Sequence, residues 1–281
     1  RFDRAGKPVP FESTGKHELF VDPNPVIDKF PERAHLAKMW TCWWDVYCGL
    51  DVDSEGNIYY VNKDDRYVEN NSVFPAYGLY RQIDVWDSSG KLKQEGLLDL
   101  ISVKGVQVDK DGYLYIVHMP GDSDAYVKRV NRADPAAKKA FKRIPMRQFA
   151  LSKSAPTGGE PLWTRPWDGN PGMSLIPPNP HCICSTHRIN QALDNKGYAY
   201  MAGKHSIQVI DTKTGKLVGE FGTYGNTDCK GKDSAYPNPE LPFGAISSLV
   251  VWKDKLFVLD VINRRLVKCN ITYDPALKGA E

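Results

Sequence analysis

The stretch Gly49-Leu-Asp-Val-Asp-Ser-Glu-Gly-Asn-Ile-Tyr-Tyr-Val-Asn62 recurs along the chain and decides the fold. Further copies begin at Gly105, Asn190 and Ser247, and the last copy carries Asp254 where the others have glycine. Each copy reads as a short apolar strand, an Asp-x-x-Gly turn and a second strand of aromatic and β-branched residues. Asp accepts hydrogen bonds from its own downstream amides, and glycine adopts a positive φ without steric penalty. The repeat therefore predicts a series of β-hairpins, with a different turn in the fourth copy.

A second phrase follows the first at a distance and completes a larger unit. Residues 83–91 and 208–216 each read as a strand and a turn, and further strands are expected at 92–98 and 217–221. Four short antiparallel strands joined by tight turns are typical of a β-propeller blade. Because one blade cannot bury both of its faces, neighbouring blades must stack. The chain is predicted to be all-β, with residues 1–281 forming a single β-propeller domain of four-stranded antiparallel blades.

The spacing of the copies is uneven. Gly112 and Gly197 are separated by more residues than Gly56 and Gly112, and the extra residues predict an irregular insertion at about 132–180. Long insertions in compact domains are often functional.

The first residues resemble half of a blade. Residues 2–7 match the turn at 87–91, while residues 264–272 already read as the third strand of the last blade. The chain thus shows about four and a half blades. We expect it to be part of a six- or seven-bladed ring, or a processed product of one.

Composition and charge narrow the class of protein. A net charge of +3 without a basic cluster argues against a nucleic-acid partner, and no apolar run is long enough to span a membrane. Six cysteines favour an oxidising compartment, so we expect a periplasmic or extracellular location. Pairing of Cys42 with Cys48, or of Cys229 with Cys269, stays open because spacing does not determine it.

The densest group of possible metal ligands precedes the third blade. It comprises His181, Cys182, Cys184 and His187. Thiolate and imidazole together suit zinc or copper, although this spacing is poor for one tetrahedral site. The alternative is that one cysteine forms a disulfide and the other side chains pack or form hydrogen bonds.

Two further sets of residues are candidates because loops near the ring axis commonly hold ligands. Asp45, His187 and Arg188 are the polar candidates for a catalytic centre, but only two of the four blades supply polar groups there. The ends of the second strands could hold a divalent cation such as calcium, or could be polar residues that enter a turn. These positions are Asn62, His118, Gly203 and Asp260.

The remaining histidines and the loop tryptophans have simpler interpretations. His17, His35 and His205 are read as isolated surface residues. Tryptophans outside the expected strands could contact a partner or be buried under the insertion. They are Trp40, Trp43, Trp44, Trp163 and Trp167.

The Asp-x-x-Gly-Asn-Ile-Tyr phrase resembles NHL-repeat propellers. The C-terminal third, at 221–228, 239–243 and 260–267, is similar to a group of long secreted bacterial NHL-like proteins, in which the Cys-x-Cys at 182–184 also recurs. The resemblance implies the fold and an exported location, and it implies no reaction. Two enzyme families share NHL-like propellers, a zinc-dependent lyase and a calcium-dependent lactonase, and this chain matches neither ligand set.

These observations support a main hypothesis and two alternatives. The main hypothesis is an exported binding or scaffold subunit of a periplasmic redox or multi-subunit assembly, whose partners are other protein subunits or the missing part of the propeller. The first alternative is a metal-dependent lyase or lactonase-like hydrolase, with zinc, copper or calcium near His187 and Asp45. In the second, the Cys182–Cys184 pair contacts a cofactor that a partner subunit holds.

Overall fold

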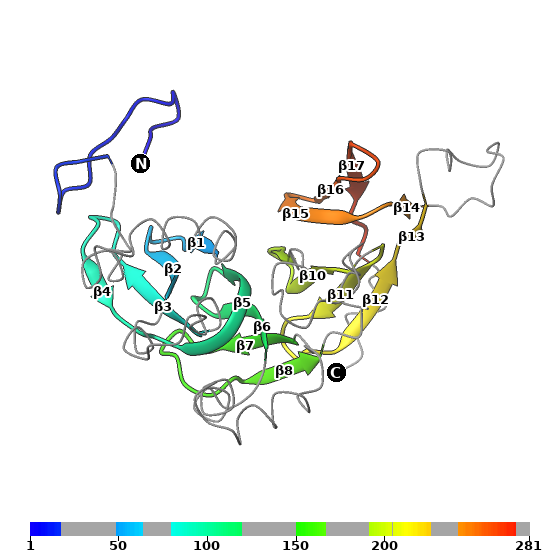
Figure 1. The fold of residues 1–281 in the computed structure, drawn as a ribbon, viewed down its shortest axis with the longest axis horizontal. Coiled ribbons are helices and arrows are strands. Elements are labelled where there is room, and N and C mark those ends of the chain that lie inside the picture. The colour runs from blue at the N-terminus through cyan, green and yellow to red at the C-terminus, as the bar shows by residue number, and fades with distance from the viewer. Residues whose placement is uncertain are drawn as a thin grey trace, which may run out of the picture. The chain divides into compact units, whose positions relative to one another are not determined.

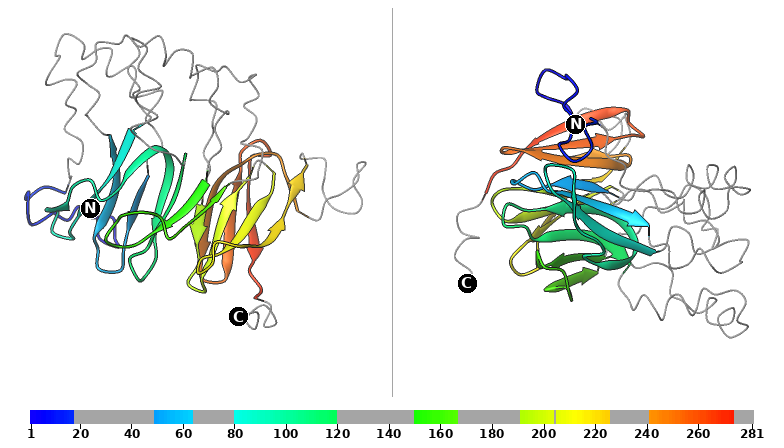
Figure 2. Two further views of the ribbon diagram at one scale, coloured as in Figure 1. Left: turned by 90° about the horizontal axis from the view of Figure 1, so that it is seen from below. Right: turned by 90° about the vertical axis from the view of Figure 1, so that its left-hand side faces the viewer.

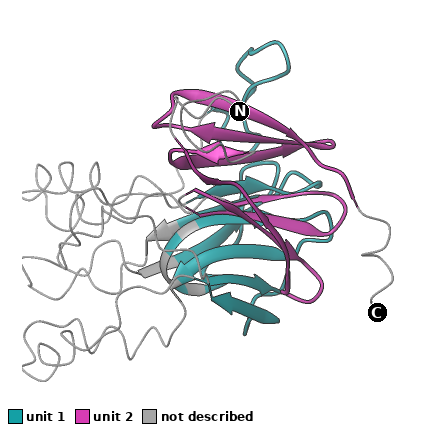
Figure 3. Ribbon diagram, turned by 90° about the vertical axis from the view of Figure 1, so that its right-hand side faces the viewer, with its two compact units in different colours: residues 1–167 teal, residues 168–281 magenta. Residues whose placement is uncertain are grey.

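A computed structural model describes residues 1–17, 49–63, 80–119, 150–166, 191–203, 205–225 and 241–273. These ranges contain strands and turns and no helix, as Figure 1 shows, which confirms the predicted all-β class. No helix that could cross a membrane is found within them. The chain divides into two compact units, residues 1–167 and 168–281 (Figure 3), and each is described by itself.

The first unit contains two four-stranded antiparallel blades (Figure 2). A short pairing of β3 with β5 joins them into one eight-stranded sheet. The first blade consists of β1 (Leu50–Val52), β2 (Ile58–Lys63), β3 (Tyr80–Trp86) and β4 (Leu92–Gln94). The second consists of β5 (Asp99–Val108), β6 (Leu114–Met119), β7 (Ala150–Ser154) and β8 (Trp163–Pro166).

The expectation of an irregular insertion across 132–180 is wrong for residues 150–166. In this segment β7 pairs with β6, and β8 pairs with β7, so the segment supplies the outer half of the second blade. Its strands were not recognised because Ala150-Leu-Ser-Lys-Ser154 lacks aromatic residues and carries no Asp-x-x-Gly turn. The helical pattern at 135–143 lies outside the described residues.

The second unit contains a four-stranded blade and a three-stranded one. The third blade consists of β9 (Gln191–Leu193), β10 (Tyr198–Ala202), β11 (Ile207–Asp211) and β12 (Leu217–Phe221). A short parallel pair follows, β13 (Thr223–Tyr224) with β14 (Pro242–Phe243). The fourth blade consists of β15 (Ile246–Trp252), β16 (Lys255–Asp260) and β17 (Arg265–Asn270), and β17 confirms the expected third strand.

The Asp-x-x-Gly turns share one hydrogen-bond pattern. One carboxylate oxygen of Asp109 accepts from the backbone N–H groups of Asp111 (2.9 Å) and Tyr113 (3.0 Å), and the other accepts from the hydroxyl of Tyr115 (3.1 Å). Asp53 and Asp194 do the same in their own hairpins, with Tyr59 and Tyr200 as the hydroxyl donors. The motif therefore joins the turn to the buried second strand, which explains why aspartate and tyrosine recur six residues apart.

The fourth copy has a different turn, as its sequence predicts. Trp252 pairs directly with Lys255, so only two residues connect β15 to β16, and Lys253 adopts the left-handed conformation at φ 56°.

The N-terminal turn matches the second phrase of the repeat. Asp3 accepts from the N–H groups of Ala5 and Lys7, as Asp87 accepts from those of Ser89 and Lys91. Residues 1–9 therefore form a turn of the same kind, closed by an isolated bridge between Phe2 and Pro8.

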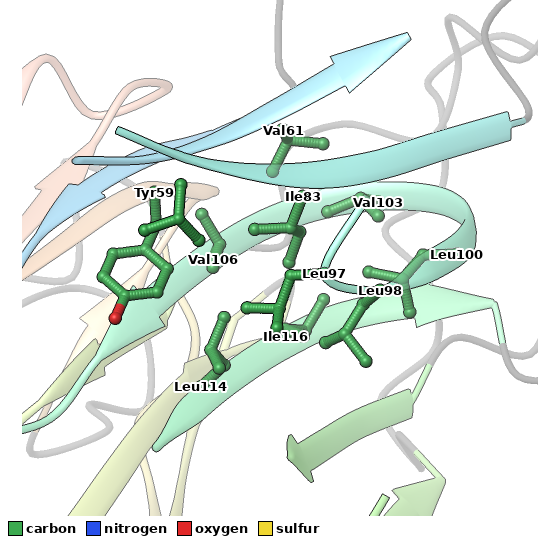
Figure 4. Close-up of a cluster of buried hydrophobic side chains, with 11 residues drawn as sticks. Tyr59, Val61, Ile83, Leu97, Leu98, Leu100, Val103, Val106, Leu114 and Ile116 are labelled. Carbon is green, nitrogen blue, oxygen red and sulfur yellow. The ribbon is translucent and has the colours of Figure 1, made fainter. Parts of the chain in front are cut away.

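Stacked sheet faces form the core of each unit. In the first unit, the face of the first blade that bears Tyr59 and Val61 packs against the face of the second blade that bears Leu114 and Ile116 (Figure 4). We call the side of a blade that carries the tyrosine bonded to the turn aspartate its tyrosine face, and the other side its opposite face. In the fourth blade Phe257 occupies the position of this tyrosine in the repeat. Asp51, on the tyrosine face of the first blade, also accepts from the backbone N–H of Val108 (2.7 Å) and so links the first strands of the two blades.

The second unit repeats this arrangement. The tyrosine face of the third blade, with Tyr200 and Ile207, packs against Leu249, Leu256 and Val258 on the opposite face of the fourth blade. In both units, then, the tyrosine face of one blade packs on the opposite face of the next.

Gly158 provides a test of how closely the first two blades approach. A Cβ on this residue would overlap the carbonyl oxygen of Leu97, and its φ of +76° disfavours any side chain. We expect Gly158→Ala to lower the free energy of unfolding by roughly 1–3 kcal/mol for overpacking, in addition to roughly 1–2 kcal/mol for the left-handed backbone. Gly159→Ala is the matched control, because it has φ +87° and open space around it. Equal losses in chemical denaturation would contradict the close approach.

Candidate functional site

Most of the predicted catalytic and metal-binding residues lie outside the part of the chain that the structure describes. Asp45, His181, Cys182, Cys184, His187 and Arg188 lie outside it, as do Trp40, Trp43, Trp44 and Trp167. Within the described ranges, no three His, Cys, Asp or Glu side chains gather closely enough to hold a metal ion.

His118, one of the four strand-end candidates, is buried and belongs to a polar network that runs out to the exposed Thr164. It lies in β6, and its Nε2 is 2.8 Å from the Oγ of Ser152, which is 2.8 Å from the Oγ1 of Thr164. The three residues come from adjacent strands, so the network ties β6, β7 and β8 together. His118 is the penultimate residue of β6, and its side chain binds a partner within its own blade.

Asp260, another strand-end candidate, is fully buried, and its carboxylate accepts several hydrogen bonds. Its carboxylate accepts from the backbone N–H groups of Gly244 (3.1 Å) and Ala245 (3.0 Å) and from the side-chain amide of Asn263 (2.7 Å). The Nε of Arg265 lies 3.3 Å away, and the guanidinium also donates to the carbonyl of Pro242. The carboxylate thus fastens the link that enters β15 to the turn between β16 and β17.

Burial alone would raise the pKa of Asp260. The hydrogen bonds from Ala245, Gly244 and Asn263 outweigh burial and hold the pKa below its ordinary value. Because the folded-state pKa is lower than the unfolded one, the charged carboxylate stabilises the fold above the unfolded value, and this contribution is lost as the pH falls through the folded pKa.

We therefore expect Asp260→Asn to lower the free energy of unfolding by about 3 kcal/mol at neutral pH, since it leaves a network of buried donors without their charged acceptor. The variant should also lose less stability than the wild type when the pH falls below about 4. Denaturation across a pH series measures both effects. Asp254→Asn, at the exposed tip of the β15–β16 hairpin, is the control and should change stability far less. Equal effects of the two variants would show that Asp260 is not the anchor.

The other two strand-end positions are described through their backbone bonds. Gly203 donates its N–H to the carbonyl of Ser206 in the turn between β10 and β11. Asn62 is a backbone member of β2, paired with Gln82. His118 and Asp260 each engage partners in their own unit. A cation site shared by the strand ends stays a prediction.

The fold changes two other expectations and leaves the pairing of Cys229 untested. His205 is not an isolated surface residue, because its Nδ1 is 3.1 Å from the carbonyl of Phe243 and its ring packs edge-on against Tyr224. Trp163 is part of β8 and packs near Tyr115. Cys269 is a free, half-buried thiol whose pKa is raised by burial, and Cys229 lies outside the described residues.

The fourth blade has one large apolar face that no described element of the second unit covers. On this side β15 presents Val250 (55% exposed) and Trp252 (60%), while Leu259 and Leu266 on the next strands are 39% and 65% exposed. The register places these side chains together, because Val250 pairs with Phe257 and Leu259 pairs with Leu266. We call this surface the outer face of the fourth blade. It comprises Val250, Trp252, Phe257, Leu259, Leu266 and Lys268.

The outer face of the fourth blade is suited to binding another protein surface. Removal of its exposed valine, leucine and tryptophan side chains from water lowers the free energy. Tryptophan is also frequent at the centres of protein interfaces. Lys253 lies over the Trp252 ring at 4.5 Å and gives the patch a positively charged border. Contiguous exposed apolar side chains with a polar border are typical of interaction sites. This face is the candidate functional site that the described residues define.

The strand arrangement defines an all-β protein built of propeller-type blades. No protein-family model matches the chain, and no curated protein matches its sequence. Among solved structures, hydrazine synthase from Kuenenia stuttgartiensis is similar at 12% identity and a TM-score of 0.42, covering 80% of this chain and 58% of that one. Glutaminyl cyclase from Myxococcus xanthus is similar at 10% identity and a TM-score of 0.38, covering 75% and 60%. A chain of the nidogen/laminin complex is similar at 12% identity and a TM-score of 0.40, covering 80% of this chain and 76% of that one. The chain thus spans less than two thirds of the first two proteins, and at this level of similarity no activity is transferred.

Proposed function

We propose that the chain is an exported NHL-like β-propeller that acts as a binding or scaffold subunit in a periplasmic redox or multi-subunit assembly. The observation that carries the proposal is the outer face of the fourth blade, where Val250, Trp252 and Leu266 are each more than half exposed. Exposure of such an apolar face to water is unfavourable in free energy, and binding of a protein surface removes this unfavourable exposure.

The polar groups that the repeat makes prominent support the same proposal. The aspartates of the Asp-x-x-Gly turns accept from their own turn amides and tyrosines, and Asp260 is surrounded by donors. These carboxylates stabilise hairpins and connections between strands. What the described blades offer to a ligand is therefore apolar surface rather than a set of converging polar groups.

The export part of the proposal rests on sequence. The C-terminal third resembles secreted NHL-like proteins, and the six cysteines are in keeping with an oxidising compartment. The metal-dependent enzyme, with zinc, copper or calcium near His187 and Asp45, stays the competing prediction. A substoichiometric metal content in the purified protein would count against it.

Native mass spectrometry of the tagged protein isolated from its natural source tests the scaffold proposal. We expect a defined complex with other protein subunits. The double variant Trp252→Glu and Leu266→Glu should weaken the assembly by at least about tenfold, because it places charges in an apolar contact. Lys196→Glu, an exposed change in the turn between β9 and β10, is the control and should leave the complex intact. Isolation of a lone monomer with hydrolase or lyase activity would overturn the proposal.

A further inference from the structure

Blade stacking in this chain has a direction. In the first unit the tyrosine face of the first blade packs on the opposite face of the second. In the second unit the tyrosine face of the third blade packs on the opposite face of the fourth. A free tyrosine-side face is therefore complementary to a free opposite face, and not to another copy of itself.

The outer face of the fourth blade is a free face of the tyrosine side. Leu249, Leu256 and Val258 point to the opposite side, where they pack on the third blade. Strand alternation then places Val250 and Phe257 on the tyrosine side.

The first blade presents a free face of the complementary kind. Tyr59 and Val61 are on its packed tyrosine face. On the other side Leu50 and Val52 are 62% and 50% exposed, and Leu92 is 39% exposed. The register aligns Val52, Ile58, Trp86 and Leu92 in one row across the four strands. We call this surface the outer face of the first blade. It comprises Leu50, Val52, Ile58, Tyr60, Trp86 and Leu92.

We propose that the outer face of the fourth blade binds the outer face of the first blade of a second copy of this chain. This inference rests on the proposed function, since it names the partner of the same apolar surface. The contact continues the stacking order found within each unit, with one apolar sheet packed on the next. It is a head-to-tail contact between two different surfaces, which forms a closed ring or an open chain of copies according to its geometry.

Charge at the border of the two faces agrees with this orientation. Within the first unit, the bond from Val108 to Asp51 places the first strands of stacked blades side by side. The same stacking between copies places β15 beside β1. The hairpin tip, where Lys253 and Lys255 outnumber Asp254, then lies next to the turn that holds Asp53 and Glu55, so regions of opposite net charge meet.

The alternative of two identical faces in contact is electrostatically unfavourable. Pairing of two outer faces of the fourth blade would set against each other two surfaces that each carry Lys253, Lys255 and Lys268. Asp254, between the two lysines of the hairpin tip, pairs with Lys255 at 3.2 Å and also interacts with Lys253, so each face keeps an excess of positive charge. The charges therefore favour the first blade as the partner surface.

Sedimentation equilibrium of the purified chain as a function of concentration tests the proposal. We expect reversible self-association, weakened at least about tenfold by Val250→Glu and likewise by Val52→Glu. Lys196→Glu should leave it unchanged, and circular dichroism verifies that each variant is folded. A wild-type protein that stays monomeric at all concentrations would overturn the proposal. So would a monomer in which both faces are protected from hydrogen exchange, because that result means closure within one chain.

A charge exchange tests the direction of the contact. Lys253→Glu and Glu55→Lys should each reduce self-association, because each variant brings like charges together. An equimolar mixture of the two variants should associate again, since opposite charges then meet between the β15–β16 hairpin tip of one chain and the β1–β2 turn of the other. Failure of the mixture to associate would overturn the head-to-tail arrangement. The measurement uses the purified chain alone, so it is independent of whether other subunits bind, which tests the proposed function separately.

Discussion

The packing of one sheet face on the next is the interaction on which each described unit depends. A four-stranded blade has apolar side chains on both of its faces. Contact with one neighbouring blade buries only one of these faces and leaves the other exposed to water. The first and second blades solve this problem for one face each, through Tyr59, Val61, Leu114 and Ile116. The third and fourth blades do the same through Tyr200, Leu256 and Val258. The faces that remain uncovered at the first and fourth blades follow from the same constraint, and they lead directly to the proposed interaction surfaces.

Carboxylates make this stacking possible by fixing the chain between strands. Asp109 binds two amides of its turn with one oxygen and the hydroxyl of Tyr115 with the other, so the turn and the buried strand are positioned together. Asp260 performs a comparable task at the last blade, where it anchors Gly244, Asn263 and Arg265. In both cases a conspicuous acidic residue serves the fold. Residue type alone therefore could not distinguish an anchor such as Asp260 from a cation ligand.

The sequence predicted much of the fold from local patterns. Asp-x-x-Gly and the aromatic strand after it gave the hairpins, the missing glycine at Asp254 gave the altered turn, and the Asp3 turn was recognised by its likeness to Asp87. These succeeded because each motif completes its hydrogen bonds within a few residues. The outer strands of the second blade were missed, since Ala150–Ser154 is specified by pairing with β6 and not by its own composition. The predicted centre around Asp45, His187 and Arg188 stays a prediction, and so does the metal group at His181, Cys182, Cys184 and His187.

The sequence by itself determined the repeat, the turn chemistry and hence the class of fold, because these depend on residues close together in the chain. Only the tertiary structure decided which side of each strand is covered. Val250 and Leu249 are adjacent and similar in character, yet the Leu249 side chain is only 3% exposed and Val250 is 55% exposed. Successive side chains of a strand point to opposite faces, and a neighbouring sheet determines which face is removed from water. The candidate interaction surface is therefore a property of how the blades stack, which no local motif encodes.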